Sequence, residues 1–385
     1  MPDFSLYEPH EDSYLLAEQV KKFAQGKVLD MGCGSAIQAV TAAKLTRVQF
    51  VLAVDIQPEV ITHCKKSVQH PKISFRVSDL FSHIQDKFDT IVFNPPYLPN
   101  DLRVSDIALD GGKHGPEVLE RFIQDAPLHL KPRGQLLFLF SSLSKPMRVQ
   151  EALKNVLLDW EEVAQKKYAF EQLFVYRAAK NLPRLILEQR DIRNIRMLTH
   201  GHRGFIVTGI WKGKKVAAKF QRSDSPAKGT VTREAKMLRM LNKNEIGPKI
   251  IASGKDYFLY RFIEGEFIEP WVAKHSAAQI RRVLRKILEQ MWTLDKLGIT
   301  KEEMHHPYKH LIVDKKEKPW LVDFERAHKS QRPKNVTQFC QYLRSQRMQS
   351  LLEHRGISIS KKLLQQYASG YKINSRSFSD IEKLL

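Results

Sequence analysis

The feature that most constrains the fold of this sequence is a turn with two glycines, Asp30-Met31-Gly32-Cys33-Gly34, between an apolar run and an amphipathic stretch. Val28 to Asp30 is predicted as a buried strand, and a helix is predicted from Ile37 to Leu45. A strand, a glycine turn and a helix in this order are typical of a nucleotide-binding α/β sheet. Gly32 and Gly34 have no Cβ atom, so a ligand can approach the backbone closely there.

Short apolar runs and amphipathic stretches alternate throughout the first half of the chain. This alternation predicts a doubly wound α/β domain, and the segment from Val163 to Arg177 has the pattern of two closing strands. The strand pattern ends and basic charge begins between Ala178 and Pro183, so we predict domains of residues 1–180 and 181–385. The other predicted helices are 11–23, 59–68 and 149–158, and the other predicted strands are 50–55, 73–77, 90–93 and 135–140.

A carboxylate ends the second predicted strand at Asp55, 21 residues after Gly34. At this place it can accept hydrogen bonds from both hydroxyls of a ribose. A dinucleotide site would have a third glycine where this chain has Ile37, so the pattern favours S-adenosylmethionine over NAD. Asp79 and Leu80 follow the third strand and are predicted to bracket the adenine, with Asp79 accepting from its exocyclic amine. The predicted cofactor site combines these residues with Asp30, Gly32 and Gly34.

The loop Asn94-Pro95-Pro96-Tyr97 follows the fourth predicted strand, at the edge where open α/β sheets bind their ligands. A planar amide or aromatic amine is a poor nucleophile because its lone pair is delocalised. The Asn94 side-chain oxygen and the Pro95 carbonyl can each accept one N–H of such a group and so orient its lone pair. Pro95 and Pro96 stiffen the loop, and Tyr97 offers a flat face. We therefore predict methyl transfer to a planar nitrogen without a metal.

The Asn94–Tyr97 loop and the Asp30–Gly34 turn together resemble those of the HemK-like methyltransferases. Tyr7 to Ser13 and Asp110 to Gly115 are similar to the shorter archaeal and eukaryotic branch, and the resemblance covers residues 5–178. It implies a class I fold and methylation of the glutamine in the Gly-Gly-Gln loop of a peptide chain release factor. Ala36 stands where relatives usually have glycine. The resemblance assigns the acceptor amide to Asn94 and the cofactor to Ser13, Asp30, Gly32, Asp55, Asp79 and Leu80.

The resemblance leaves open whether a small activator subunit is required, as in eukaryotic relatives. The same Asn-Pro-Pro-Tyr loop also serves enzymes that methylate adenine or guanine amino groups in RNA or DNA, and this alternative stays open.

The distribution of charge along the chain is relevant to the nucleic-acid alternative. Residues 1–180 hold 22 basic and 22 acidic residues, whereas the rest of the chain holds 41 basic and 20 acidic residues. The whole net charge of +21 therefore lies in the second half. This indicates RNA or the ribosome as a partner, the alternative being a solvated surface.

The composition predicts a cytoplasmic protein that does not enter a membrane. Cys33, Cys64 and Cys340 are far apart and form no C-x-x-C pair for zinc or redox chemistry. A reduced compartment is the default for such a chain. No apolar run is long enough to span a bilayer, and the first residues lack the pattern of an export signal.

The second half changes to short strands around Gly201 and Gly204, one helix at 232–241, and mostly helices from Ser276 onward. Val216-Ala217-Ala218-Lys219 resembles the strand of protein kinases whose lysine holds nucleotide phosphates. About residues 195–350 resemble the small archaeal kinases related to the Rio and Bud groups, which have a two-lobed α+β fold.

The kinase resemblance implies ATP and Mg²⁺ as ligands. Glu234 would pair with Lys219, and Asp323, in Leu321-Val322-Asp323-Phe324, would bind the metal, with Glu325 where glycine is usual. The catalytic loop departs from the family, since His305 to His310 contains no aspartate at the base position. Positioning and charge do most of the work in phosphoryl transfer, so two interpretations remain open. One is a serine/threonine kinase, and the other is a degenerate kinase fold that carries the methyltransferase to RNA or the ribosome.

Overall fold

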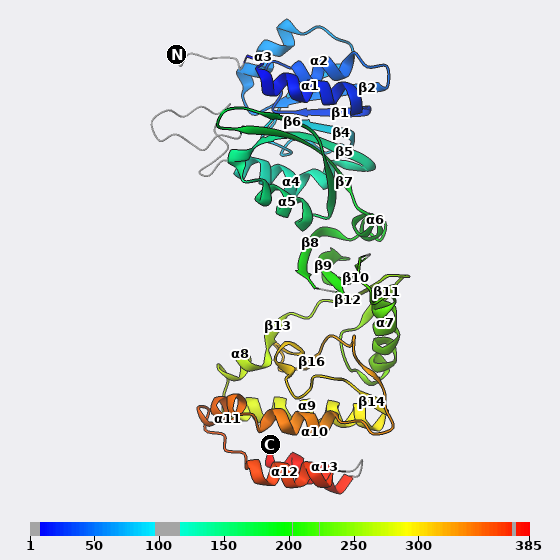
Figure 1. Ribbon diagram of the computed structural model, residues 1–385, viewed down its shortest axis with the longest axis vertical. Helices are drawn as coiled ribbons and strands as arrows, with labels where there is room; N and C mark the ends of the chain where they lie inside the picture. Colours follow the sequence, from blue (N-terminus) through cyan, green and yellow to red (C-terminus); the bar gives the residue numbers. More distant parts are fainter. Residues whose placement is uncertain (1–7, 97–115, 202, 223, 372–374) are drawn as a thin grey trace. The chain divides into compact units, whose positions relative to one another are not determined.

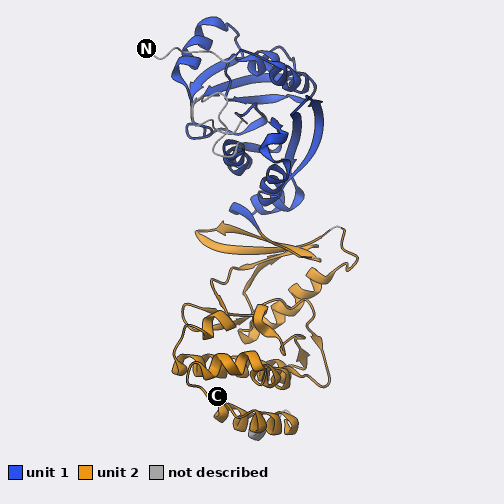
Figure 2. Ribbon diagram, turned by 60° about the vertical axis from the view of Figure 1, so that its left-hand side comes forward, with its two compact units in different colours: residues 1–197 blue, residues 198–385 orange. Residues whose placement is uncertain are grey.

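The computed structural model describes residues 8–96, 116–201, 203–222, 224–371 and 375–385, and the chain divides into two compact units, Met1–Met197 and Leu198–Leu385 (Figures 1 and 2). The division lies beyond the predicted boundary near residue 180, because α6 (Leu182–Glu188) packs on the first unit. The buried Arg184 donates to the carbonyl oxygen of Val156 at 2.7 Å and to the Glu188 carboxylate at 2.8 Å.

The first unit contains a seven-stranded sheet with the strand order β3-β2-β1-β4-β5-β7-β6. β3, β2, β1, β4 and β5 are parallel, and β7 and β6 are added antiparallel at one edge. The predicted doubly wound α/β domain with a closing antiparallel hairpin is therefore confirmed. The strands are β1 (Gly26–Met31), β2 (Val48–Asp55), β3 (Ile73–Val77), β4 (Phe88–Phe93), β5 (Leu130–Ser141), β6 (Leu158–Lys167) and β7 (Gln172–Lys180).

Helices cover both faces of this sheet (Figure 1). One apolar cluster joins the sheet to α1 (Glu11–Phe23), α2 (Ile37–Ala43) and α3 (Pro58–Ser67). A second cluster joins the other face to α4 (Glu117–His129) and α5 (Pro146–Asn155), and a short 3₁₀ turn, η1 (Ser142–Ser144), precedes α5. No element was predicted for the segment that forms α4, whose last turn contains Pro127, a residue that interrupts helical patterns.

A five-stranded sheet of order β11-β12-β10-β9-β8 and a helical part make up the second unit, and β8 begins in the last five residues of the first unit. β9 to β12 pair antiparallel, and α7 and the later helices share one apolar cluster. α9 follows a capping box of Ser276 and Gln279 that satisfies free backbone N–H groups. The bounds are β8 (Arg193–His200), β9 (Gly204–Trp211), β10 (Lys214–Gln221), α7 (Thr230–Leu241), η2 (Asn242–Asn244), β11 (Ile250–Ser253), β12 (Tyr257–Arg261), α8 (Ile268–Val272), α9 (Ala277–Lys296), α10 (Asn335–Leu343), α11 (Gln346–Glu353), α12 (Lys361–Gly370) and α13 (Ser375–Leu384).

Two small sheets complete the helical part. β13 (Gly265–Phe267), β15 (Leu311–Asp314) and β16 (Pro319–Leu321) form one, and β14 (Ile299–Thr300) and β17 (His328–Lys329) form the other. A 3₁₀ turn, η3 (Pro307–Lys309), precedes β15. Among the residues that the structure describes, no helix is both long and apolar enough to cross a membrane.

Candidate active site

The carboxyl ends of three neighbouring strands bring the predicted methyl-donor and acceptor residues to one edge of the sheet. In the register of the sheet, Met31 of β1 lies between Val54 of β2 and Phe93 of β4. Gly32, Asp55 and Asn94 therefore stand at or just after adjacent strand ends, as expected for a ligand site in an open α/β sheet.

The glycine turn adopts a backbone that favours glycine. Gly32 and Gly34 have φ angles of 61° and 49°, and a Cβ atom on Gly32 would lie 3.2 Å from the Phe93 ring. Ala36 also has a positive φ, 63°, at the start of α2. Left-handed backbone is costly for alanine and free for glycine, which accounts for the glycine that the family resemblance led us to expect at this position.

Asp30 connects the turn to α2. It is 1% exposed, and its Oδ2 atom accepts the Ala39 backbone N–H at 2.9 Å. Burial raises the pKa of Asp30 to about 8, and the nearby Asp55 carboxylate adds to the rise. Asp30 thus lies in the predicted cofactor site, although its hydrogen bond holds the backbone of the chain itself.

Asp55 also holds the turn. Its Oδ2 atom accepts the Gly34 N–H at 3.1 Å, and its Oδ1 atom accepts the Gln57 N–H at 3.0 Å. Burial raises the pKa of Asp55 against the opposing effect of these hydrogen bonds. Each carboxylate oxygen has a further lone pair, so Asp55 can hold the turn and still accept from a ribose hydroxyl. The close glycine backbone beside this carboxylate fits an adenosyl ligand.

Asp79 and Leu80 lie after β3, as the sequence predicted. Leu80 has a positive φ of 45°, and its carbonyl oxygen accepts from the Ser78 hydroxyl at 2.8 Å. The Asp79 carboxylate is half exposed and accepts from the Arg121 guanidinium at 3.1 Å. A contact between Asp79 and adenine stays a prediction.

Asn94 is held by a residue that the sequence did not single out. The Asn94 Nδ2 atom donates to Asp12 Oδ2 at 2.9 Å, and Asp12 lies in the first turn of α1 and is 5% exposed. The Asn94 Oδ1 atom is buried and accepts no hydrogen bond from any residue that the structure describes. This oxygen can therefore accept an N–H from a bound acceptor group, which is the role predicted for Asn94.

Some of the remaining predicted residues of this site are described by the structure, and others lie outside the described residues. Ser13 is buried next to Asp12, and its carbonyl oxygen accepts from Gln38 Nε2 at 2.9 Å, which ties α1 to α2. Pro95 is buried beside Asn94, and Pro96 is half-buried. Three predicted elements lie outside the described residues: Tyr97, the Tyr7 end of the first motif, and Asp110 to Gly115.

Comparison with known proteins agrees with this geometry. The family described as "Methyltransferase small domain" matches residues 4–171. A protein of Methanocaldococcus jannaschii named "Putative protein N5-glutamine methyltransferase" is 37% identical over 180 residues, which are 45% of this chain and 91% of that protein. The chain belongs to the methyltransferase small domain family. Its first unit is an S-adenosylmethionine-dependent methyltransferase with the class I, Rossmann-like fold that the sequence predicted.

Other relatives match the same half of the chain. The mouse protein "Methyltransferase HEMK2" is 28% identical over 193 residues, 46% of this chain and 90% of that protein. A "Release factor glutamine methyltransferase" of Koribacter versatilis is 33% identical over 170 residues, 40% of this chain and 59% of that protein. A solved structure of the E. cuniculi Mtq2–Trm112 complex is 26% identical, with a TM-score of 0.38, over 46% of this chain and 98% of that one.

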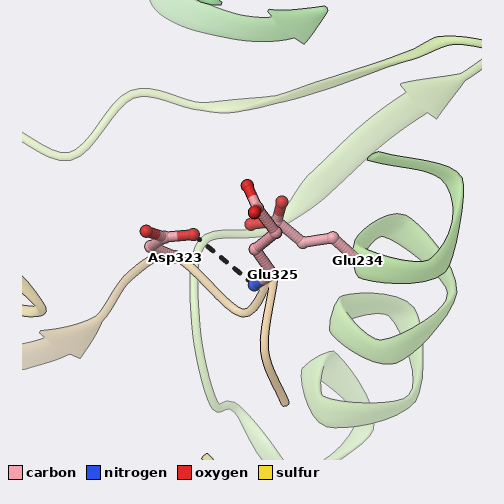
Figure 3. A group of neighbouring side chains, drawn as sticks. All are labelled: Glu234, Asp323 and Glu325. Atoms are coloured by element: carbon pink, nitrogen blue, oxygen red, sulfur yellow. Dashed lines mark hydrogen bonds between the residues drawn. The ribbon is translucent and has the colours of Figure 1, made fainter. Parts of the chain in front are cut away.

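The second unit holds a cluster of charged side chains around Lys219 of β10. The Lys219 Nζ atom lies 2.6 Å from Glu234 of α7, 3.2 Å from Asp323 and 3.3 Å from Glu325. Figure 3 shows the three carboxylates close together, and one oxygen of each lies within 4.8 Å of the others. Burial disfavours the charge of Lys219, but Glu234 and Asp323 outweigh it and raise the pKa of this ammonium.

Two charged residues beside this cluster were missed in the sequence. Lys301 is 1% exposed and donates to the Asp323 carbonyl oxygen at 2.6 Å. Burial lowers the pKa of Lys301 to about 8. Glu303 has a positive φ of 74° and lies 3.2 Å from His310 and 2.8 Å from Arg326. The motif that the sequence analysis considered in this region begins at His305. Lys301 and Glu303 lie before it and were therefore not among the predicted site residues.

Of the two glycines of the predicted hairpin, Gly201 follows β8 and Gly204 begins β9. The Gly201 N–H donates to the Gly204 carbonyl oxygen at 2.9 Å. A Cβ atom on Gly204 would lie 2.6 Å from the Phe220 carbonyl oxygen of β10, so close strand pairing accounts for this glycine. A role in covering phosphates stays a prediction.

Proposed function

We propose that the first unit methylates the side-chain amide nitrogen of the glutamine in the Gly-Gly-Gln loop of a peptide chain release factor. The observation that carries this proposal is the buried Asn94 Oδ1 atom, which has no donor among the described residues and stands next to the glycine turn and Asp55 across adjacent strands. A primary amide supplies the missing N–H donor.

S-adenosylmethionine supplies an electrophilic methyl group when it is bound. The residues of the chain have to orient a weakly nucleophilic nitrogen and to shed water from it. Asn94 Oδ1 and the Pro95 carbonyl can each accept one N–H, which leaves the nitrogen lone pair directed at the donor. The donor would be held beside Gly32, Gly34 and Asp55 and would supply the methyl group as an electrophile, and the amide nitrogen would lose one proton to solvent as it gains that group.

The names of relatives support the protein acceptor. Relatives at 37% and 33% identity carry the names of glutamine methyltransferases, and one of these names specifies release factors. A relative of Mannheimia succiniciproducens named "Ribosomal RNA small subunit methyltransferase C" matches a shorter stretch, 34% of this chain at 30% identity. Guanine or adenine amino groups present the same planar N–H donors, so nucleic acid is the alternative acceptor.

The test is mass spectrometry of the host's release factor from a strain lacking this gene. We expect the loss of one methyl group from the Gly-Gly-Gln glutamine, restored by the wild-type gene and not by Asn94→Ala. The purified Asn94→Ala variant should lose about 10²-fold or more in rate and keep its affinity for S-adenosylmethionine within a few-fold. An unchanged release factor in the deletion strain, together with lost methylation of ribosomal RNA, would select the nucleic-acid alternative.

We propose as a second function that the second unit binds ATP with Mg²⁺. The observation in its favour is the buried Lys219, which pairs with Glu234 at 2.6 Å and contacts Asp323 at 3.2 Å, the three residues that the kinase resemblance assigned to this purpose. An ammonium fixed between a helix carboxylate and a second acidic residue is the usual arrangement for holding phosphates near a metal ion.

Thermal shift of the full chain with ATP and Mg²⁺ tests this second proposal. We expect ATP to raise the unfolding temperature of one transition in the wild type and not in Lys219→Ala. Lys214→Ala is the matched control, because it removes an exposed lysine from the same strand and should keep the shift. Release of labelled phosphate separates a kinase from a nucleotide-binding scaffold, which would show the shift without turnover. A shift that survives in the double variant Lys219→Ala, Asp323→Ala would place the nucleotide elsewhere.

A further inference from the structure

We propose that Asp12 is a positioning residue for methyl transfer and acts through Asn94. The inference rests on the proposed function, in which Asn94 Oδ1 accepts an N–H of the acceptor nitrogen. Asp12 lies 82 positions before Asn94 in the chain, and its carboxylate meets the Asn94 amide nitrogen at 2.9 Å.

The chemistry of Asp12 determines which way the Asn94 amide points. A side-chain amide has nearly the same shape when its oxygen and nitrogen are exchanged, but only the nitrogen donates hydrogen bonds. An ionised carboxylate can only accept, so it holds the amide nitrogen and repels the amide oxygen. The Oδ1 atom of Asn94 is then directed away from Asp12, into the buried place where it has no donor among the described residues. If Oδ1 and Nδ2 of Asn94 were exchanged, the amide would turn its own N–H groups toward the N–H groups of the nitrogen to be methylated, and no hydrogen bond could form.

The location of Asp12 strengthens this effect. Its side chain is 5% exposed, so its charge is little screened by water. A negative charge on the nitrogen side of an amide polarises the group and makes its oxygen a stronger acceptor. The acceptor nitrogen loses electron density as it takes up the methyl group, so its N–H groups become better donors. The hydrogen bond to Asn94 Oδ1 therefore strengthens toward the transition state, which is the condition for raising the rate.

A purely structural role for Asp12 predicts different behaviour. Asp12 lies in the first turn of α1, where a carboxylate is favoured by the helix dipole, and the Ser13 hydroxyl lies 3.4 Å from its Oδ1 atom. If stabilising α1 were its whole contribution, substitution would lower the unfolding temperature and leave the turnover of the folded enzyme unchanged. It would also act independently of Asn94.

A double-mutant cycle on the full chain, with the release factor as acceptor, distinguishes the two roles. We expect Asp12→Ala to lower kcat about 10²-fold, as for loss of an orienting contact, with S-adenosylmethionine affinity within about twofold. In the Asn94→Ala background, Asp12→Ala should have almost no further effect, because its contribution passes through Asn94. Asp12→Asn, which keeps the shape but can offer its own oxygen, should recover part of kcat. Glu11→Ala removes an exposed carboxylate of the same helix turn and should leave kcat unchanged.

Equal effects of Asp12→Ala with and without Asn94 would overturn the proposal, as would a loss of stability with normal kcat. The side-chain amide resonances of Asn94 give a second measurement that needs no acceptor. In the wild type one Nδ2 proton should be shifted by its hydrogen bond to the carboxylate. The shift should vanish in Asp12→Ala, become smaller in Asp12→Asn, and stay unchanged in Glu11→Ala. If the wild type methylates neither release factor nor nucleic acid, the proposed function fails, whereas unchanged Asn94 resonances in the Asp12 variants refute the role of Asp12 alone.

Discussion

At the scale of single residues, the methyl-donor site uses its carboxylates to hold the backbone that surrounds the ligand. Asp30 accepts from Ala39, and Asp55 accepts from Gly34 and Gln57. At position 55 an asparagine would present an N–H pair to one of the two backbone N–H groups, whereas the Asp55 carboxylate accepts with both oxygens. The turn is therefore formed before any ligand binds, which lowers the entropy that binding has to overcome.

Asp55→Ala is expected to weaken S-adenosylmethionine binding by about 1.5–3 kcal/mol, the usual loss when hydrogen bonds to a charged acceptor are removed. The variant loses the ribose acceptor and the support of the Gly34 turn together. Titration calorimetry of the full chain measures the affinity. Asp79→Ala is a useful comparison, because Asp79 is half exposed and paired with Arg121, and a smaller loss is expected there. Unchanged affinity in Asp55→Ala would mean that the ribose binds elsewhere.

At the scale of elements, the link from β1 to α2 carries a titrating group. The pKa of Asp30 is raised to about 8 from an ordinary value near 4, so the folded chain binds this proton more tightly than the unfolded chain does. The stability it contributes is fully present below about pH 4 and is lost as the pH rises through 8. The unfolding transition of the first unit can be identified as the one that S-adenosylmethionine shifts. Without cofactor, the free energy of unfolding for this transition should therefore fall between pH 5 and 8 in the wild type. Asp30→Asn should flatten this dependence, and an unchanged slope would contradict the assignment.

The attachment of α6 to the first unit depends on one carboxylate. Glu188 pairs with Lys180 at 2.7 Å and with Arg184 at 2.8 Å, and the two basic side chains are 1% exposed. Glu188→Ala leaves two buried cations without a counter-ion, which is expected to cost about 3 kcal/mol in the free energy of unfolding. Urea unfolding of the full chain measures this. Glu161→Ala, which breaks an exposed pair with Arg177, should change the same transition by less than about 1 kcal/mol. If both substitutions lowered the free energy of unfolding equally, burial would not determine how much the Glu188 ion pairs contribute to stability.

Elements with strong local patterns could be predicted from the sequence, and contacts between distant residues could not. The helix from Glu11 to Phe23 and the strand from Ile73 to Val77 were predicted with the bounds that the structure shows, because their apolar residues repeat with the periods of a helix and a strand. The first helix after the acceptor loop, α4, was missed, because a proline stands in its last turn. The partner of Asn94 was also missed, since nothing local in the sequence couples positions 12 and 94.

At the scale of the whole molecule, chemistry and charge are divided between the two halves of the chain. The half that carries the methyltransferase has no net charge over residues 1–180, and the other half carries the net charge of +21. Within the second unit, Lys219 is neutralised by three carboxylates, so its charge does not contribute to an outer basic surface. A nucleotide site and a polyanion surface can therefore exist in the same unit without sharing residues.

If this charge serves RNA, binding of the full chain to a labelled single-stranded RNA should fall steeply with salt. Each neutralised phosphate releases a condensed counter-ion, and a site with six to ten such contacts loses about 10³-fold or more in affinity between 50 and 200 mM salt. Lys219→Ala should keep both affinity and slope, because the side chain is buried, and this separates RNA binding from ATP binding. Fluorescence anisotropy over a salt series measures the slope. A flat dependence with no retention on a polyanion column would make the charge an ordinary solvated surface.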